Sequence, residues 1–163
     1  QIKRMGCSMK VERTFDYDLI MSVVSKPEFT AVFEDGLSLD NYRPDTKSAW
    51  ILVTDNNDII ALTRFKPLNA ITVEAHPRVL KEHRSKYNKL SMIETYKWIL
   101  AFASQYKKIN AEIPVIYPHL KRYIFSIGFS LEGVNRKSHL KNGKIVDKWV
   151  FGITQEEIKE EVA

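Results

Sequence analysis

A carboxylate and an imidazole lie two residues apart at the end of a predicted strand. Glu74 and His76 have equal parity on that strand, so they point to the same side of the sheet if the strand is regular. Either group can take up a proton, and the pair is therefore a candidate general base. The alternative is a surface acid next to a strand-end histidine.

A polar and basic stretch precedes the clearest helix start in the sequence. Ser91-Met-Ile-Glu94 has the pattern of a capping box, which places the start of a helix at Ser91. A helix N-terminus presents amides without partners and a partial positive charge, so it can hold a phosphate. The candidate anion-binding residues are Arg84, Ser85, Lys86, Tyr87, Asn88, Lys89 and Ser91. The same stretch can also be a solvated loop.

The remaining histidines and the single cysteine do not form a recognisable site. His83, His119 and His139 lie in different segments without metal-ligand spacing, so we expect no metal. Cys7 has no partner for an internal disulfide and no His or Asp near it in sequence. We therefore expect it to be a free thiol on an N-terminal arm.

Alternating and 3.6-residue apolar patterns predict the elements that position these groups. Strands are expected over residues 10–15, 49–54, 59–65, 68–75, 111–116, 129–136 and 148–153. Helices are expected over residues 16–24, 91–107 and 118–126, with a short acidic helix after Thr154.

Cap and turn residues predict where these elements end. Asp16 can cap the first helix, and Gly128 can end the helix that Pro118 opens. Asn142-Gly143 is typical of a hairpin turn. The strand over 68–75 should stop at His76-Pro77, because proline cannot continue a central ladder.

The order of the elements predicts the fold class. A strand, a helix, a hairpin and a strand are followed by a long helix, a strand, a helix and a final hairpin. The fold class is therefore α/β (α+β): a mixed, mostly antiparallel sheet with a central βαβ unit and flanking helices. We expect one domain over 10–153, an N-terminal arm over 1–9 and an acidic C-terminal tail over 154–163.

Length, composition and charge limit the classes of protein to which this chain can belong. The 163 residues suit one domain, and 44% hydrophobic with 28% charged residues is ordinary for a soluble globular protein. No apolar stretch can cross a bilayer and no secretory signal is visible, so we expect a cytoplasmic protein without a membrane partner. The net charge of +5 can attract an anionic cofactor, but no nucleic-acid motif accompanies it, and we expect no nucleic-acid partner.

The element order resembles that of the GNAT (N-acetyltransferase) superfamily over nearly the whole chain. The most specific likeness is Tyr123-Ile-Phe-Ser-Ile127-Gly128-Phe129 followed by Glu132-Gly133, which is similar to the strand-five, helix-four segment of that family. Val73-Glu-Ala-His-Pro77 resembles the end of its strand four.

The resemblance implies acetyl-CoA as cofactor and transfer of its acetyl group to an amine of a small molecule or a protein. The CoA diphosphate would lie at the start of the Ser91 helix, near Arg84 and Lys86. Glu74 or His76, directly or through water, would take the proton from the amine.

The sequence departs from the pattern of the family at two places. The glycine-rich phosphate loop corresponds to residues 84–89, which contain no glycine. The general-acid tyrosine, four residues before the last glycine of the motif, corresponds to Ile124, with Tyr123 one position away. An enzyme with these changes should be slow, and Tyr123 should not reach the CoA thiolate.

These departures keep a second interpretation open. The pattern His76-Pro77…Arg84…Trp98 and the turn Asn142-Gly143-Lys144 also resemble GNAT-like proteins of tailed phages. That resemblance implies a catalytically degenerate protein, a pseudoenzyme, that acts in phage virion or head assembly. It would have protein assembly partners and lie in the host cytoplasm or the virion, and such a role permits the loss of signature residues.

Overall fold

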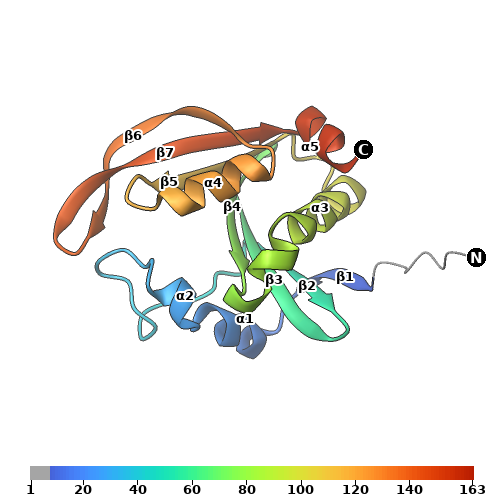
Figure 1. The fold of residues 1–163 in the computed structure, drawn as a ribbon, viewed down its shortest axis with the longest axis horizontal. Coiled ribbons are helices and arrows are strands. Elements are labelled where there is room, and N and C mark those ends of the chain that lie inside the picture. The colour runs from blue at the N-terminus through green and yellow to red at the C-terminus, as the bar shows by residue number, and fades with distance from the viewer. Residues whose placement is uncertain (1–7) are drawn as a thin grey trace, which may run out of the picture.

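A computed structural model describes residues 8–163 of the chain, so Cys7 and most of the predicted N-terminal arm lie outside the described part. One seven-stranded sheet has the order β1-β2-β3-β4-β5-β7-β6 (Figure 1). The strands are β1 (Met9–Thr14), β2 (Ala49–Asp55), β3 (Asp58–Pro67), β4 (Thr72–Val79), β5 (Lys108–Pro114), β6 (Ser130–Lys141) and β7 (Lys144–Thr154). The helices are α1 (Tyr17–Val24), α2 (Pro27–Thr30), α3 (Arg84–Phe102), α4 (Pro118–Ser126) and α5 (Gln155–Val162), with a 3-10 turn, η1 (Lys81–His83).

Strand pairing confirms the predicted fold class. β4 and β5 run parallel and are joined through α3, whereas every other neighbouring pair is antiparallel. This is the mixed, mostly antiparallel sheet with a central βαβ unit that the order of the elements predicts.

Helices cover both faces of the sheet. On one face α3, α4 and α5 bury Tyr96, Ile124 and Ile158 against sheet residues that include Phe151. On the opposite face α1 and α2 bury residues such as Val23 against Trp50, Leu52 and Leu62. Because successive strand residues alternate between faces, β2 and β3 contribute to both cores, whereas the buried hydrophobic residues of β5 and β7 belong to the first core.

Several predicted boundaries are confirmed by their backbone geometry. The Asp16 carboxylate accepts from the Leu19 amide at 3.1 Å and caps α1. Gly128 ends α4 with φ +97°, and a Cβ there would meet the Glu161 side chain. The turn at Asn142-Gly143 has positive φ at both residues, as a tight hairpin requires. The hairpin strands extend further toward this turn than predicted, as β6 and β7.

The predicted start of the long helix is wrong. α3 begins at Arg84 and ends at Phe102, so Ser91 lies inside it and is buried, with an exposed fraction of 2%. Its carbonyl accepts from the Thr95 hydroxyl, which is an interior helix contact. A stretch without glycine or proline continues as helix because nothing in it interrupts the hydrogen-bond ladder.

The predicted end of the fourth strand is also wrong. β4 runs through His76-Pro77 to Val79 and stays paired with β3, with Pro77 opposite Thr63. β5 pairs only with residues 72–74, so Pro77 lies where one edge of β4 has no neighbouring strand. Proline is tolerated on such an edge, because no ladder partner there needs its missing N–H.

The acidic C-terminal segment is a helix packed on the domain. Thr154 and Glu157 form the predicted capping box at the start of α5, and Ile158 is buried in the core beneath α3. Residues 154–163 thus contribute to the same core as the sheet.

Replacing Thr154 by Ala should lower the free energy of unfolding by about 1 kcal/mol, because it removes an N-cap acceptor. Ser91→Ala is the matched comparison. It should leave the stability unchanged or slightly higher, because alanine is the better helix former at an interior position. Urea unfolding followed by circular dichroism measures both, and an equal loss for the two variants would contradict the helix start at Arg84.

Candidate active site

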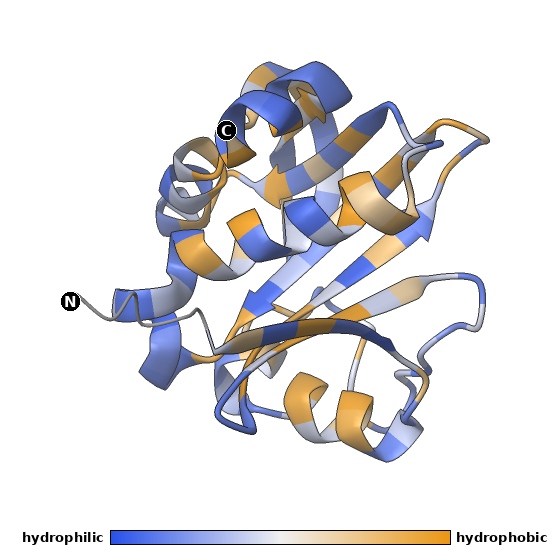
Figure 2. Cartoon of the chain, turned by 90° about the vertical axis from the view of Figure 1, so that its right-hand side faces the viewer, coloured by the Kyte–Doolittle hydropathy of each residue, from blue (hydrophilic) through white to orange (hydrophobic). Residues whose placement is uncertain are grey.

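Two parallel strands separate in the middle of the sheet. β4 and β5 are paired only from Thr72–Lys108 to Glu74–Asn110. Beyond these residues β4 stays with β3 and β5 stays with β7, so the two halves of the sheet diverge (Figure 2). The facing edges therefore carry backbone groups without a strand partner, and such groups can bind an extended ligand.

Glu74 and His76, the two residues predicted to act as a general base, lie where the strands separate. His76 Nε2 is 2.7 Å from Glu74 Oε1, which confirms that the two side chains share one side of the sheet. The hydrogen bond from His76 holds the pKa of Glu74 below its ordinary value, so this carboxylate is ionised at neutral pH. The side chains are 25% and 41% exposed for Glu74 and His76, so the pair is accessible from solvent.

The N-terminus of α3 follows the far end of β4. The Arg84 amide donates to the Lys81 carbonyl of η1. Ser85 and Lys86 are the exposed residues of the first turn of α3. Asn88 and Lys89 lie in the second turn, and the buried Ser91 lies further along. The structure therefore brings Ser85 and Lys86 to a helix start and excludes Ser91 from it.

Arg84 and Tyr87 have structural contacts. Arg84 Nε donates to the Val79 carbonyl at 3.0 Å, and its guanidinium lies over the Phe29 ring. The Tyr87 hydroxyl donates to the carboxylate of Asp55, the last residue of β2, and the Tyr87 side chain is buried. These contacts fasten the first turn of α3 to the sheet.

The sequence matches no protein-family model and no curated protein sequence. The structure is similar to a crystal structure of spermidine N-acetyltransferase from Vibrio cholerae in complex with CoA and spermine. The TM-score is 0.75 at 17% identity, over 93% of this chain and 98% of that chain. Mutant forms of the spermidine/spermine N-acetyltransferase of the same organism give a TM-score of 0.75 at 15% identity, over 96% and 99%. The chain has the GNAT fold.

Within this GNAT fold, Tyr123 and Ile124 of α4 both pack against the core that contains β4 residues, but they have different surroundings. Tyr123 packs against the cluster that contains Val79 and Tyr87, and its hydroxyl is buried without a hydrogen-bond partner among the described residues. Burial raises the pKa of Tyr123 well above its ordinary value. Ile124 is instead buried in the main core. A phenol that holds its proton this strongly is a poor general acid.

The side of the GNAT sheet that carries Glu74 and His76 is rich in buried polar groups. His76 is directly opposite Arg64 on β3, and Arg64 is opposite Trp50, so these residues face α1 and α2. Buried polar atoms without a partner on this side belong to Tyr42, Trp50, Arg78, Asn110 and His139. Arg78 is not among the site residues predicted from the sequence, because the predicted strand ends at His76-Pro77. Continued alternation would have placed Arg78 beside Glu74 and His76.

Hydrogen bonds join the loop after α2 to the turn between β6 and β7 on this side of the domain. The Asp35 carboxylate accepts from the amides of Asn142 and Gly143 at 3.0 and 2.8 Å, so the loop after α2 is joined to the β6–β7 turn. The hydrogen bonds from Gly143 and Asn142 lower the pKa of Asp35. The two hydrogen bonds to the carboxylate are therefore at full strength above the ordinary carboxyl pKa and weaken as the pH falls through the lowered value, whereas the bond from the Asp35 amide to the Leu140 carbonyl does not depend on this titration.

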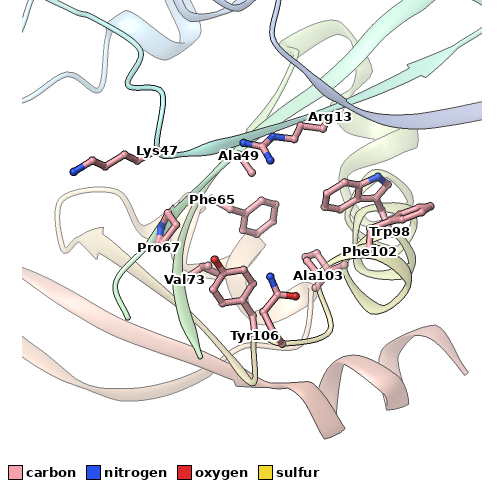
Figure 3. A pocket seen from close by; sticks show the side chains of 12 residues that line it. Arg13, Lys47, Ala49, Phe65, Pro67, Val73, Trp98, Phe102, Ala103 and Tyr106 are labelled. Atoms are coloured by element: carbon pink, nitrogen blue, oxygen red, sulfur yellow. The ribbon is translucent and has the colours of Figure 1, made fainter. Parts of the chain in front are cut away.

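A small hollow lies on the other face, under the end of α3. It has a volume of about 150 Å³ and an aromatic and aliphatic lining that includes Phe65, Val73, Trp98 and Tyr106 (Figure 3). Val73 points away from the side that carries Glu74, so this hollow is separate from the proposed base.

Within residues 8–163 no group of three or more His, Cys, Asp or Glu side chains is arranged to hold a metal ion. Among the helices of this described part, none is both long and apolar enough to cross a membrane.

Proposed function

We propose that this chain is an acetyl-CoA-dependent N-acyltransferase. The observation that carries the proposal is the position of the Glu74–His76 pair at the point where β4 and β5 separate. The GNAT fold and the neighbours with N-acetyltransferase activity support it. A cytoplasmic location goes with this proposal.

The residues on the opposite side of the separation fit a CoA-type cofactor. The helix start at Ser85 and Lys86 suits a diphosphate, because it combines first-turn amides with an exposed cation. The unpaired edge of β4 suits the amide-containing arm, and the buried Tyr123 hydroxyl is a donor that lacks an acceptor. When bound, acetyl-CoA supplies an activated thioester carbonyl.

The Glu74–His76 pair supplies the proton transfer. The Glu74 carboxylate orients the imidazole through Nε2, and Nδ1 takes the proton as the amine attacks. With acetyl-CoA bound, a C–N bond would form to the amine and the C–S bond would break, which would release the CoA thiolate. Glu74 also stabilises the imidazolium that results, because it stays ionised at neutral pH.

The assembly interpretation finds less support. The departures that suggested it were the missing glycines and the displaced tyrosine, but the helix start at Arg84 still offers a phosphate site. Nothing in the described residues specifically favours an assembly role, and the structural neighbours are acetyltransferases.

Isothermal titration calorimetry with acetyl-CoA and free CoA, followed by thioester consumption with a panel of amines, tests the proposal. Binding of both cofactors and turnover with at least one amine are the expected results. A folded protein that binds neither cofactor would overturn it.

Replacing Lys86 by Ala should weaken CoA binding about 3- to 10-fold, because it removes one exposed cation from the proposed diphosphate site. The loss should shrink as salt is added. Lys159→Ala, which removes an exposed cation from α5, is the matched control and should bind CoA normally. Arg84→Ala is less informative, because Arg84 also holds the end of β4. Unchanged affinity in Lys86→Ala at low salt would place the diphosphate elsewhere.

A further inference from the structure

A half-buried arginine with one fully buried nitrogen lies beside the proposed base without an anionic partner. The Arg78 guanidinium packs 5.7 Å from the centre of the Trp50 ring, and its Nη1 is buried without a hydrogen-bond acceptor in the described part of the chain. Burial lowers the pKa of Arg78, but an arginine remains charged at neutral pH. The side chain as a whole is half-buried and reaches solvent in part.

The charges around Arg78 do not balance. Arg64 also lies over the Trp50 ring, at 5.8 Å, and it is paired with Asp45. Asp45 further accepts from the Ser48 amide and hydroxyl, so its hydrogen-bonding capacity is used. No carboxylate of residues 8–163 lies within ion-pair distance of Arg78. Of the two guanidinium groups, only that of Arg64 has a carboxylate partner, which leaves the positive charge of Arg78 without compensation.

The unpaired atoms around this charge are all able to donate. Besides Arg78 Nη1, the Trp50 Nε1 and the Tyr42 hydroxyl are buried without a hydrogen bond of normal geometry in the described structure, although the Tyr42 oxygen lies close enough to Arg78 to stabilise its charge. Arginine and tryptophan nitrogens can only donate hydrogen bonds, and a tyrosine hydroxyl can do so as well. Three donors on neighbouring side chains and a net positive charge fit an anion.

An unpaired buried charge is costly, and such groups are normally paired. The missing anion would lie close to the reaction, because Arg78 is two residues beyond His76 on the same side of β4. That spacing is about 6.6 Å along a strand. A small molecule can therefore contact both side chains at once.

We infer that the acceptor amine carries an anionic group, a carboxylate or a phosphate, which Arg78 binds while the amine lies at His76. This inference rests on the proposed acyltransferase function. It separates the chain from its structural neighbour crystallised with spermine, a polyamine. Arg78 orients the acceptor, and Tyr42 and Trp50 provide further donors.

Matched acceptor pairs test the inference. Each pair contains an anionic amine and its uncharged counterpart: L-amino acids with their carboxamides, and phosphoethanolamine with ethanolamine. Spermidine is included as a polycation. The variants are Arg78→Met, which keeps length and removes charge, Arg78→Lys, which keeps charge, and Arg13→Met, which removes an exposed arginine from β1 as the matched control.

The wild type should use the anionic member of at least one pair roughly 10- to 100-fold better in kcat/KM, as expected for a hydrogen bond between charged groups. Arg78→Met should abolish that ratio with little change toward the neutral member, Arg78→Lys should keep part of it, and Arg13→Met all of it. Without ligand, Arg78→Met should melt at the same or a higher temperature, because an unpaired buried charge is removed.

Three results would overturn the inference: equal use of both members of every pair, a ratio that survives in Arg78→Met, or spermidine as the best acceptor. If the protein binds CoA but turns over no amine, calorimetry with the same pairs decides, and failure to bind any anionic member counts against it. If the protein does not bind CoA, the proposed acyltransferase function is wrong whatever the result for Arg78. Binding of an amino acid or phosphoethanolamine that Arg78→Met abolishes would then still identify the anion site.

Discussion

Replacing Glu74 by Gln should lower kcat/KM for acetyl transfer by about 10²- to 10⁴-fold, the range usual for loss of general-base assistance. The amide cannot stabilise the imidazolium at His76, 2.7 Å away in the wild type. His76→Ala should cause a similar loss, and the double variant should be little worse than either single one, because the two groups act as a unit. A steady-state assay of thioester loss measures all three.

Two controls make this result specific. Glu112→Gln removes a nearby carboxylate that pairs with Lys148 and should cost less than tenfold. Tyr123→Phe should also cost less than tenfold, because burial makes its hydroxyl a poor acid. If Tyr123→Phe alone abolished a measurable rate in a folded protein, Tyr123 and not the Glu74–His76 pair would be the principal catalytic group.

Replacing Phe151 by Ala should destabilise the domain by about 3–5 kcal/mol, as for other buried aromatic residues truncated in a core. Phe151 is fully buried on β7 and meets the Phe125 ring edge to face at 5.2 Å. The loss is a large part of the total stability of a domain, about 5–15 kcal/mol. Chemical denaturation measures it directly.

Phe102→Ala is the matched control, because Phe102 is 72% exposed at the end of α3. Its truncation should change the free energy of unfolding by about 0.5 kcal/mol or less. A comparable loss in both variants would mean that the end of α3 is covered in solution.

The sequence predicted those parts of the fold that depend on local chemistry. Asp16, Gly128 and the turn at Asn142-Gly143 each act within a few residues, so their types are sufficient to locate a cap or a turn. The start of α3 was missed because Ser91 and Glu94 match a capping pattern that also occurs inside helices. What decides the true start is the burial of Tyr87 and its contact with Asp55, distant in sequence.

The candidate site was predictable only in part, for a related reason. Parity along β4 correctly brought Glu74 and His76 together. The strand was predicted to end too early, at Pro77, because proline is disfavoured in a central strand. The sequence does not reveal that β5 separates from β4 after residue 74, so that one edge of β4 is unpaired at Pro77. The unpaired donors of Tyr42 and Trp50 come from separate segments: the pairing of β2, β3 and β4 brings Trp50 to Arg78, and the packing of the loop after α2 brings Tyr42.

The link from Asp35 to the β6–β7 turn has a consequence for the dynamics of the domain. Asp35 and Gly143 are 108 positions apart in sequence, so their contact closes a very long loop and gains little until the sheet between them has formed. The partners themselves are exposed, but the loop after α2 also contributes Phe33, Leu37 and Tyr42 to the core under α1 and α2. Further hydrogen bonds, from the Asp35 amide to the Leu140 carbonyl and from Lys141 Nζ to the Phe33 carbonyl, join the loop to the hairpin. We therefore expect this contact to form late in folding and to open only together with that part of the core.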